Sequence, residues 1–183
     1  MYKLCKTEQS AQRQRDIENG LLDAMLLKNY EDISISDLCD HLQIPRKSFY
    51  RYFSSKDGAF HALLDHTLQE CSVETPDESD TMHYFKQYFQ FWLSRKRLLD
   101  ALERSGLSGQ LVERTITGAL QDHTFISHLV RKFPDMNQHY AALFLISGMM
   151  AMMIQWHHNG CKESPKEMAL TVSHLLTDPI FRQ

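Results

Sequence analysis

The chain has 183 residues with a formal net charge of −3, and it is 43% hydrophobic and 23% charged. This composition is typical of a soluble globular protein, and its acidic balance excludes a protein that coats nucleic acid indiscriminately. Seven glycines and five prolines are too few for a turn-rich sheet protein, so the composition favours helices.

The cysteines and the apolar segments predict a cytoplasmic protein. Four cysteines, at positions 5, 39, 71 and 161, form no CxxC pair and indicate reduced thiols. The first residues contain no apolar core of the kind found in a signal peptide. The longest apolar run, residues 140–154, is short for a membrane span, so we expect a buried helix and no membrane partner.

The N-terminal part of the sequence predicts four helices. The first starts after Thr7 or Ser10 and is expected to close at Asn29 in the left-handed conformation. Ser34 caps a short second helix that ends at residue 41. Pro45 suits the first turn of a third helix that ends near residue 53, and a fourth helix follows over residues 56–71.

Residues 72–80 are polar and acidic and show no helical periodicity, so they predict a boundary between domains 1–71 and 72–183. Further helices are expected over residues 82–93, 95–105, 111–132, 138–158 and 165–176. Ser164 and Glu167 form a capping-box pattern at the last of them. The fold class is therefore all-α, with an N-terminal helix-turn-helix domain and a C-terminal helical domain.

Charge is sorted around the predicted third helix. Residues 46–56 contain four cations and no acid, whereas residues 31–40 contain four acids. In a helix-turn-helix unit the second helix enters the major groove while the first braces it. A confined basic surface would suit the phosphate backbone. The alternative is that these cations merely solvate a helix.

The stretch ISISDLCDHLQIPRKSFYRYFSSKDGAF, residues 33–60, resembles the DNA-binding domain of the tetracycline-repressor (TetR) family. The resemblance covers roughly residues 10–70. It rests on the capped second helix, the Tyr-x-x-Phe ending of the third and the Lys that opens the fourth. It implies DNA contacts, with Tyr50 and Lys56 on phosphates, from Ser34, Arg46, Lys47, Ser48, Tyr50, Arg51 and Lys56.

Three positions depart from the family's pattern. Gln43 replaces the usual Gly of the turn, so either Gln43 has a positive φ at a cost of about 1 kcal/mol or the turn differs. Pro45 replaces the usual Ser or Thr cap, and Lys47 stands where the family often has Gly. The operator sequence therefore cannot be transferred from the family.

The resemblance implies an all-helical C-terminal domain that dimerises through its last two helices. Gly148, Trp156, Gly160 and Ser164-Pro165 match a pattern common in that domain. A helix that is apolar on every side must be covered on every side, so we expect a second subunit, although a core helix of one subunit is the alternative. The dimer residues predicted are Gly148, Met149, Met152, Met153, Trp156 and His174.

An aromatic cluster in the predicted helix 82–93 suggests a small-molecule effector pocket, with ordinary core packing as the alternative. The ligand residues predicted are Tyr84, Tyr88, Trp92, Arg104, His123 and Gln155. No His pair lies four residues apart and no catalytic or phosphate-loop motif occurs, so we expect no metal, no cofactor and no enzyme.

Three hypotheses remain, and for the third, a helical metal- or ligand-binding protein or an enzyme, the sequence shows no signature. The first is a homodimeric regulator that binds palindromic operator DNA, a repressor released by a small-molecule effector. The second is a TetR-like co-activator that acts through protein partners without binding an operator. The departures at Gln43, Pro45 and Lys47 keep the second in view.

Overall fold

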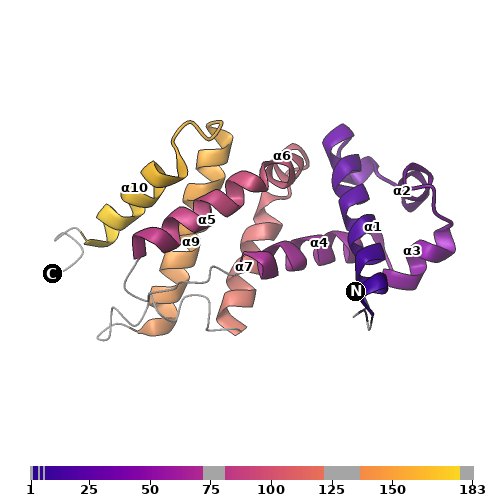
Figure 1. Cartoon of the computed structure of the whole chain (residues 1–183), viewed down its shortest axis with the longest axis horizontal. Coiled ribbons are helices and arrows are strands. Elements are labelled where there is room, and N and C mark those ends of the chain that lie inside the picture. The colour runs from indigo at the N-terminus through magenta and orange to yellow at the C-terminus, as the bar shows by residue number, and fades with distance from the viewer. Residues whose placement is uncertain (1, 4, 6, 72–80, 122–136, 178–183) are drawn as a thin grey trace. The chain divides into compact units, whose positions relative to one another are not determined.

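The computed structural model describes all residues except 1, 4, 6, 72–80, 122–136 and 178–183 (Figure 1). The described residues confirm the predicted all-α fold, because their only extended pairing is an isolated bridge between Tyr2 and Phe53. The elements are α1 (Glu8–Leu27), η1 (Tyr30–Asp32), α2 (Ile35–His41), α3 (Arg46–Tyr52), α4 (Lys56–Glu70), α5 (Thr81–Ser94), α6 (Lys96–Arg104), α7 (Ser108–Gln121), α9 (Gln138–His158) and α10 (Pro165–Thr177).

The chain divides into two compact units. The N-terminal unit comprises Met1–Glu70 together with Arg97–Gly109, and the C-terminal unit comprises Cys71–Lys96 together with Gln110–Gln183. The first unit thus includes most of α6, although α5 and most of α7, which precede and follow that helix in the chain, belong to the second. The sequence around residues 72–80 predicted a single boundary and did not indicate that α6 belongs to the N-terminal unit.

Caps define the helices of the N-terminal unit. The Thr7 hydroxyl accepts the Ser10 N–H at the start of α1, and Ser34 forms a capping box with Asp37 at α2. The expected closure of the first helix at Asn29 is wrong. The helix ends instead with the Lys28 N–H on the Ala24 carbonyl, and Asn29 has a φ of −62° because it caps η1.

A close approach of α1 to the end of α2 holds the core of the N-terminal unit together. Leu21 and Met25 of α1 are fully buried, as are Leu38 of α2 and Phe49 of α3. A Cβ added at Gly20 would lie 2.4 Å from Cδ2 of Leu42 and 2.8 Å from its Cγ. Only glycine therefore allows the two segments to pack this closely.

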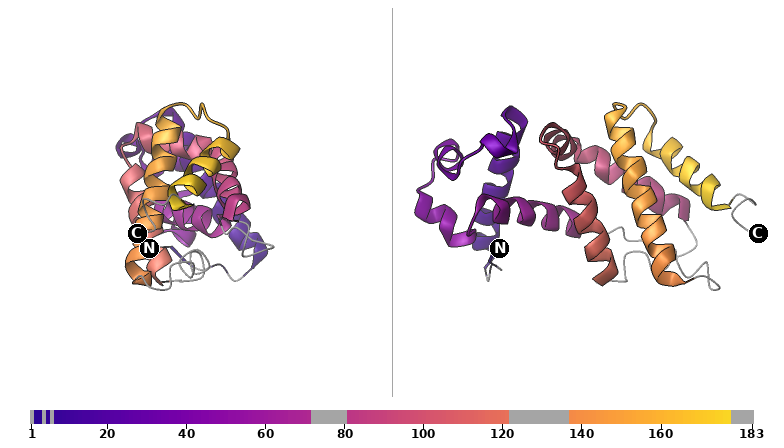
Figure 2. Two further views of the ribbon diagram at one scale, coloured as in Figure 1. Left: turned by 90° about the vertical axis from the view of Figure 1, so that its left-hand side faces the viewer. Right: turned by 180° about the vertical axis from the view of Figure 1, so that it is seen from behind.

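The C-terminal unit is built around α5, α9 and α10, and Figure 2 shows these helices from two further sides. Phe89 of α5 meets Trp156 of α9 edge to face, with ring centroids 5.5 Å apart. The Trp156 indole N–H donates to the Glu163 carbonyl at 3.0 Å. The capping box predicted at Ser164 and Glu167 is confirmed, since each side chain bonds the other's backbone N–H.

The described helices include one, α9, that is long and apolar enough to cross a membrane by length and composition alone. This is weak evidence, because the core helix of a soluble protein passes the same test. One third of its most apolar window is buried inside the protein, including Met153 at 0% exposure. The helix thus has one face in the core of the C-terminal unit.

We predict that Gly20→Ala lowers the free energy of unfolding by about 1–3 kcal/mol, because the new methyl overpacks Leu42. The matched control is Gly118→Ala in α7, where nothing lies within 4 Å of an added Cβ. That change should raise the free energy of unfolding by up to about 1 kcal/mol through helix propensity. Urea denaturation measures both, and equal effects would refute the tight α1–Leu42 contact.

Candidate nucleic-acid interface

The turn between α2 and α3 is tight and contains one strained residue. Gln43 has a φ of +52°, which is the first of the two alternatives that the sequence left open. The left-handed conformation costs a non-glycine residue about 1 kcal/mol. Backbone bonds stabilise the turn, with the Gln43 N–H on the Asp40 carbonyl and the Ile44 N–H on the Cys39 carbonyl at 3.0 Å.

The third helix buries its aromatic face and exposes its cationic face. Phe49 and Phe53 point into the core at 0% and 1% exposure, as the sequence predicts. Pro45 precedes the helix as its N-cap, one position earlier than expected, and offers no side-chain cap. Exposed residues make up the outer face: Arg46, Lys47, Tyr50 and Arg51.

The exposed side chains of α3 differ in their freedom to bind a phosphate. The Arg46 guanidinium donates to the Ser36 hydroxyl at 2.6 Å and so ties α3 to α2. Lys47 and Arg51 make no ion pair or hydrogen bond with any residue that the structure describes. Tyr50 is 51% exposed, with its ring edge-on to Phe49. Ser48 is half-buried on the same helix.

Ser34 is exposed, and its capping role leaves its own proton available. Its oxygen accepts the Asp37 N–H at 3.1 Å, so the hydroxyl can still donate to an anion. The carboxylate of Asp37 bonds Lys28 at 2.9 Å and the Ser34 N–H at 3.1 Å. These bonds lower the pKa of Asp37 to about 2. A negative charge therefore already lies at this end of α2.

Lys56 is placed against its own protein. Its ammonium donates to the Tyr30 carbonyl at 2.6 Å and lies 4.2 Å from the centroid of the Tyr30 ring. The Tyr30 hydroxyl donates to Asp57 at 2.5 Å, and burial together with that carboxylate raises the pKa of Tyr30. The sequence did not single out Tyr30, because the pairing of residues 26 positions apart leaves no local pattern.

The return of α6 to the N-terminal unit is also fixed by polar contacts. Arg97 pairs with Asp23 at 2.6 Å, and Ser105 accepts the Tyr30 N–H at 3.1 Å. Arg104, predicted to contact a ligand, instead donates to the Leu26 carbonyl at 2.6 Å. Arg104 therefore belongs to the N-terminal unit, whereas the predicted aromatic ligand residues belong to the other.

The aromatic residues predicted to bind a ligand are brought together. Tyr84, Tyr88 and Trp92 are at most 3% exposed, and burial raises the pKa of both tyrosines. The Tyr88 hydroxyl meets the Met150 sulfur at 3.4 Å. Gln155 lies elsewhere, exposed and bonded to Asn159, and His123 lies outside the described residues.

The residues predicted for the dimer interface separate into two groups. Met153 and Trp156 are 0% and 3% exposed, so within one subunit they belong to the core of the C-terminal unit. Met149 and Met152 are half-buried, and Gly148 and His174 are exposed. The sequence reasoning missed two further exposed residues on α9, Tyr140 and Phe144, at 68% and 69% exposure.

Comparisons with known proteins agree on the fold. A solved structure of the fatty acid degradation regulator FadR from Bacillus halodurans matches with a TM-score of 0.66 at 13% identity, over 94% of this chain and 96% of that chain. The dihydroxyacetone kinase operon activator DhaS matches with a TM-score of 0.63 at 13% identity, over 90% and 93%. A tetR-family transcriptional regulator from Streptomyces coelicolor matches with a TM-score of 0.61 at 19% identity, over 90% and 78%.

Family models cover both parts of the sequence, whereas no curated protein matches the chain. Residues 22–63 match the model described as bacterial regulatory proteins, tetR family. Residues 79–178, more than half of the chain, match the model described as a transcriptional regulator C-terminal region of the TetR type. The protein belongs to the TetR family of bacterial transcription regulators.

Proposed function

We propose that the protein binds palindromic operator DNA as a homodimer and inserts α3 into the major groove. The observation that carries this proposal is the outer face of α3, where Lys47, Tyr50 and Arg51 are exposed beside one another. Residues 46–56 contain no acid, so nothing within that segment neutralises these cations. DNA is the partner that such a surface suits, because phosphates surround the groove on both sides.

We assign the DNA contacts according to whether each side chain already has a partner within the protein. Lys47 and Arg51 are assigned to phosphates or base edges, and Tyr50 and Ser34 donate hydroxyl hydrogens to phosphates. Arg46 and Ser48 lie at the start of the helix, where a recognition helix approaches base edges. Lys56 is assigned an indirect part, since its ammonium is already bound to the Tyr30 carbonyl.

We predict that Lys47→Ala/Arg51→Ala weakens DNA binding by about 100-fold or more at moderate salt. Each lost phosphate contact should lower the slope of log K against log salt by about 0.9, and a dimer loses four such contacts. Fluorescence anisotropy on labelled duplexes that tile the region upstream of the gene measures both quantities.

The matched control for this experiment is Lys162→Ala/Lys166→Ala, which removes two exposed lysines of the C-terminal unit. It should leave affinity and salt slope unchanged. If wild type and the Lys47/Arg51 variant bind equally poorly at low salt, the operator proposal is refuted.

The homodimer is supported by an exposed stripe along α9. Tyr140, Phe144, Gly148, Ala151 and Gln155 recur at intervals of three or four residues, so they share one face of the helix. Phe144 is 69% exposed, and nothing lies within 4 Å of a Cβ built on Gly148. A second copy could therefore approach closely and cover these rings.

The last helix adds to this surface and to the symmetry argument. Leu170 and Leu175 of α10 are 38% and 48% exposed, and His174 lies between them. Two copies of α9 and α10 would form a four-helix interface with twofold symmetry. Such a dimer presents two recognition helices, which read successive major grooves about 34–36 Å apart.

We predict that Phe144→Glu converts the dimer to a monomer at micromolar concentration, because it buries a charge at the centre of the stripe. Sedimentation velocity measures the change, and operator affinity should fall with it. Leu27→Glu is the matched control, since Leu27 is 75% exposed at the end of α1 in the other unit. A monomeric wild type, or a dimeric Phe144→Glu variant, would contradict the proposed interface.

We further propose that a small-molecule effector binds in the C-terminal unit and releases the repressor from DNA in the cytoplasm. The aromatic cluster of Tyr84, Tyr88 and Trp92 supports this site. The segment of α6 offers a route to the DNA-binding unit, because it follows α5 in the chain and its end is bonded to α1 and η1. A ligand found by thermal shift should lower operator affinity, and Tyr88→Ala should abolish both effects. A ligand that stabilises the protein without changing operator affinity would refute release.

A co-activator that acts through protein partners is the second candidate. It is supported by the commitment of Arg46 and Lys56 to contacts within the protein, and by the fold shared with DhaS, which is described as an operon activator. The anisotropy experiment above separates the two candidates, because a co-activator of this kind binds no operator. A promoter reporter in a deletion strain then gives the direction of regulation.

A further inference from the structure

The N-terminal arm, meaning Tyr2, Lys3 and Cys5, is fixed beside the end of α3. Tyr2 forms an antiparallel bridge with Phe53, and the Lys3 N–H donates to the Tyr52 carbonyl at 3.1 Å. These bonds attach the arm to Tyr52, the last residue of α3, and to Phe53, which caps that helix. The arm is therefore part of the folded N-terminal unit and lies next to the cationic face of α3.

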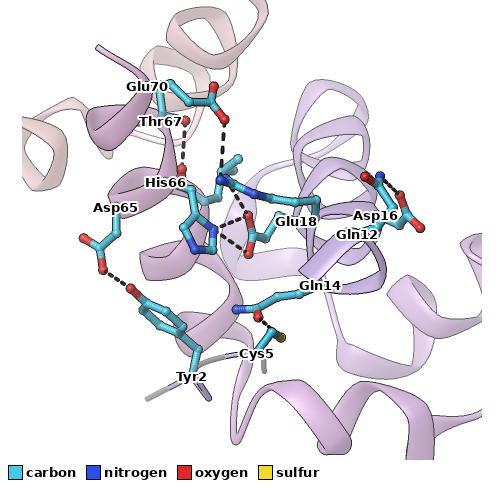
Figure 3. A network of polar contacts seen from close by, with 12 residues as sticks. Tyr2, Cys5, Gln12, Gln14, Asp16, Glu18, Asp65, His66, Thr67 and Glu70 are labelled. Carbon is cyan, nitrogen blue, oxygen red and sulfur yellow. Dashed lines mark hydrogen bonds and ion pairs between the residues drawn. The ribbon is translucent and has the colours of Figure 1, made fainter. Parts of the chain in front are cut away.

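Side-chain contacts anchor the arm to α1 and α4, as Figure 3 shows. The Tyr2 hydroxyl donates to Asp65 at 3.0 Å, and the Tyr2 ring meets the His66 ring edge-on with centroids 5.7 Å apart. The Cys5 thiol donates to Gln14 at 2.7 Å. Two of the three arm residues thus direct their side chains toward the core of the unit.

A buried carboxylate supports the surface on which the arm lies. Glu18 of α1 is 1% exposed, and both its carboxylate oxygens lie about 3 Å from Nδ1 of His66 on α4, at 3.0 and 2.9 Å. The Arg15 guanidinium lies 3.6 Å from the Glu18 carboxylate and 3.5 Å from the Glu70 carboxylate. The position of His66, on which the Tyr2 ring rests, is therefore fixed by α1.

The direction of Lys3 follows from that of Tyr2. Successive side chains of an extended segment point to opposite sides, and Tyr2 faces α4. Lys3 therefore points away from α4, and it is exposed. Its ammonium makes no ion pair or hydrogen bond with any residue in the described part of the chain. The carboxylate of Asp65 accepts the Tyr2 hydroxyl hydrogen.

We propose that the N-terminal arm is a second DNA-contacting element, in which Tyr2 positions Lys3 against the phosphate backbone flanking α3. This inference rests on the proposed DNA binding. A recognition helix of only seven residues, whose Arg46 is held by Ser36, leaves few cations for phosphates. A tethered lysine beside the end of that helix adds one phosphate contact in each half-site without lengthening the helix.

The test compares wild type, Lys3→Ala and Lys3→Arg by anisotropy on the same tiled duplexes. Lys3→Ala should weaken binding about two- to tenfold and lower the salt slope by about two for a dimer, since one contact is lost per protomer. The loss should be similar on operator and unrelated duplexes, because a phosphate contact carries no sequence information. Lys3→Arg should restore most of the affinity, and Lys162→Ala should bind as wild type does.

A double-mutant cycle tests the positioning role of Tyr2. Tyr2→Ala should weaken binding by itself, yet it should add little in the Lys3→Ala background if Tyr2 acts by placing Lys3. Additive losses would overturn the positioning role. Circular dichroism on each variant confirms that the helices remain.

The experiment distinguishes failure of the arm proposal from failure of the operator proposal. If wild type binds DNA, Lys47→Ala/Arg51→Ala does not, and Lys3→Ala retains wild-type affinity and salt slope, the arm proposal is refuted and operator binding stands. If wild type binds no duplex at low salt, both proposals are refuted.

Discussion

The N-terminal unit depends on the bonds that meet at Tyr30. The carbonyl of this residue accepts the Lys56 ammonium at the start of α4, its hydroxyl binds Asp57, and its N–H donates to Ser105 after α6. One residue in a short 3-10 turn thus joins the end of α1, the start of α4 and the end of α6. Because these bonds are buried or half-buried, breaking one would leave a partner unsatisfied at a cost of about 1–3 kcal/mol. The bonds of Tyr30 therefore also help to place α3, because α3 lies between α2 and α4 in the chain.

The cationic face of α3 is a consequence of packing on its opposite side. Phe49, Tyr52 and Phe53 are buried, so the exposed residues of α3 lie on the opposite side of the helix: Arg46, Lys47, Tyr50 and Arg51. The strained Gln43 sets the angle at which α3 leaves α2, and a strained backbone persists only where its surroundings over-determine it. Here the Ile44 N–H on the Cys39 carbonyl and the close Gly20–Leu42 contact supply that constraint. A family glycine would remove the strain but not change the direction of the helix.

Local features were predictable from the sequence and tertiary ones were not. The caps at Thr7, Ser34 and Ser164 depend on residues three positions away, and the inward phase of Phe49 and Phe53 depends on helical spacing. The contacts of Lys56 and Arg104 join residues 26 and 78 positions apart, so no local pattern indicates them. On α9 the failure has another cause. When a helix is apolar on every side, its sequence does not indicate which face is buried. The sequence therefore could not separate buried Met153 from exposed Phe144.

The distribution of free cations limits how this protein can achieve affinity for DNA. Arg46 and Lys56 have bonds within the protein, and Pro45 contributes no hydroxyl, so the helix-turn-helix itself leaves Lys47 and Arg51 for phosphates. A few charge-assisted contacts neutralise few phosphates, so they give weak binding with a shallow dependence on salt. The two proposals above would each increase the number of contacts. The proposed arm adds Lys3 beside the end of α3, and the proposed pairing through the exposed stripe of α9 doubles every contact. Because the proposed pairing doubles all contacts whereas the proposed arm adds one per half-site, we expect the exposed rings of Tyr140 and Phe144 to have the larger effect on operator affinity, although they lie in the unit that carries no part of the helix-turn-helix.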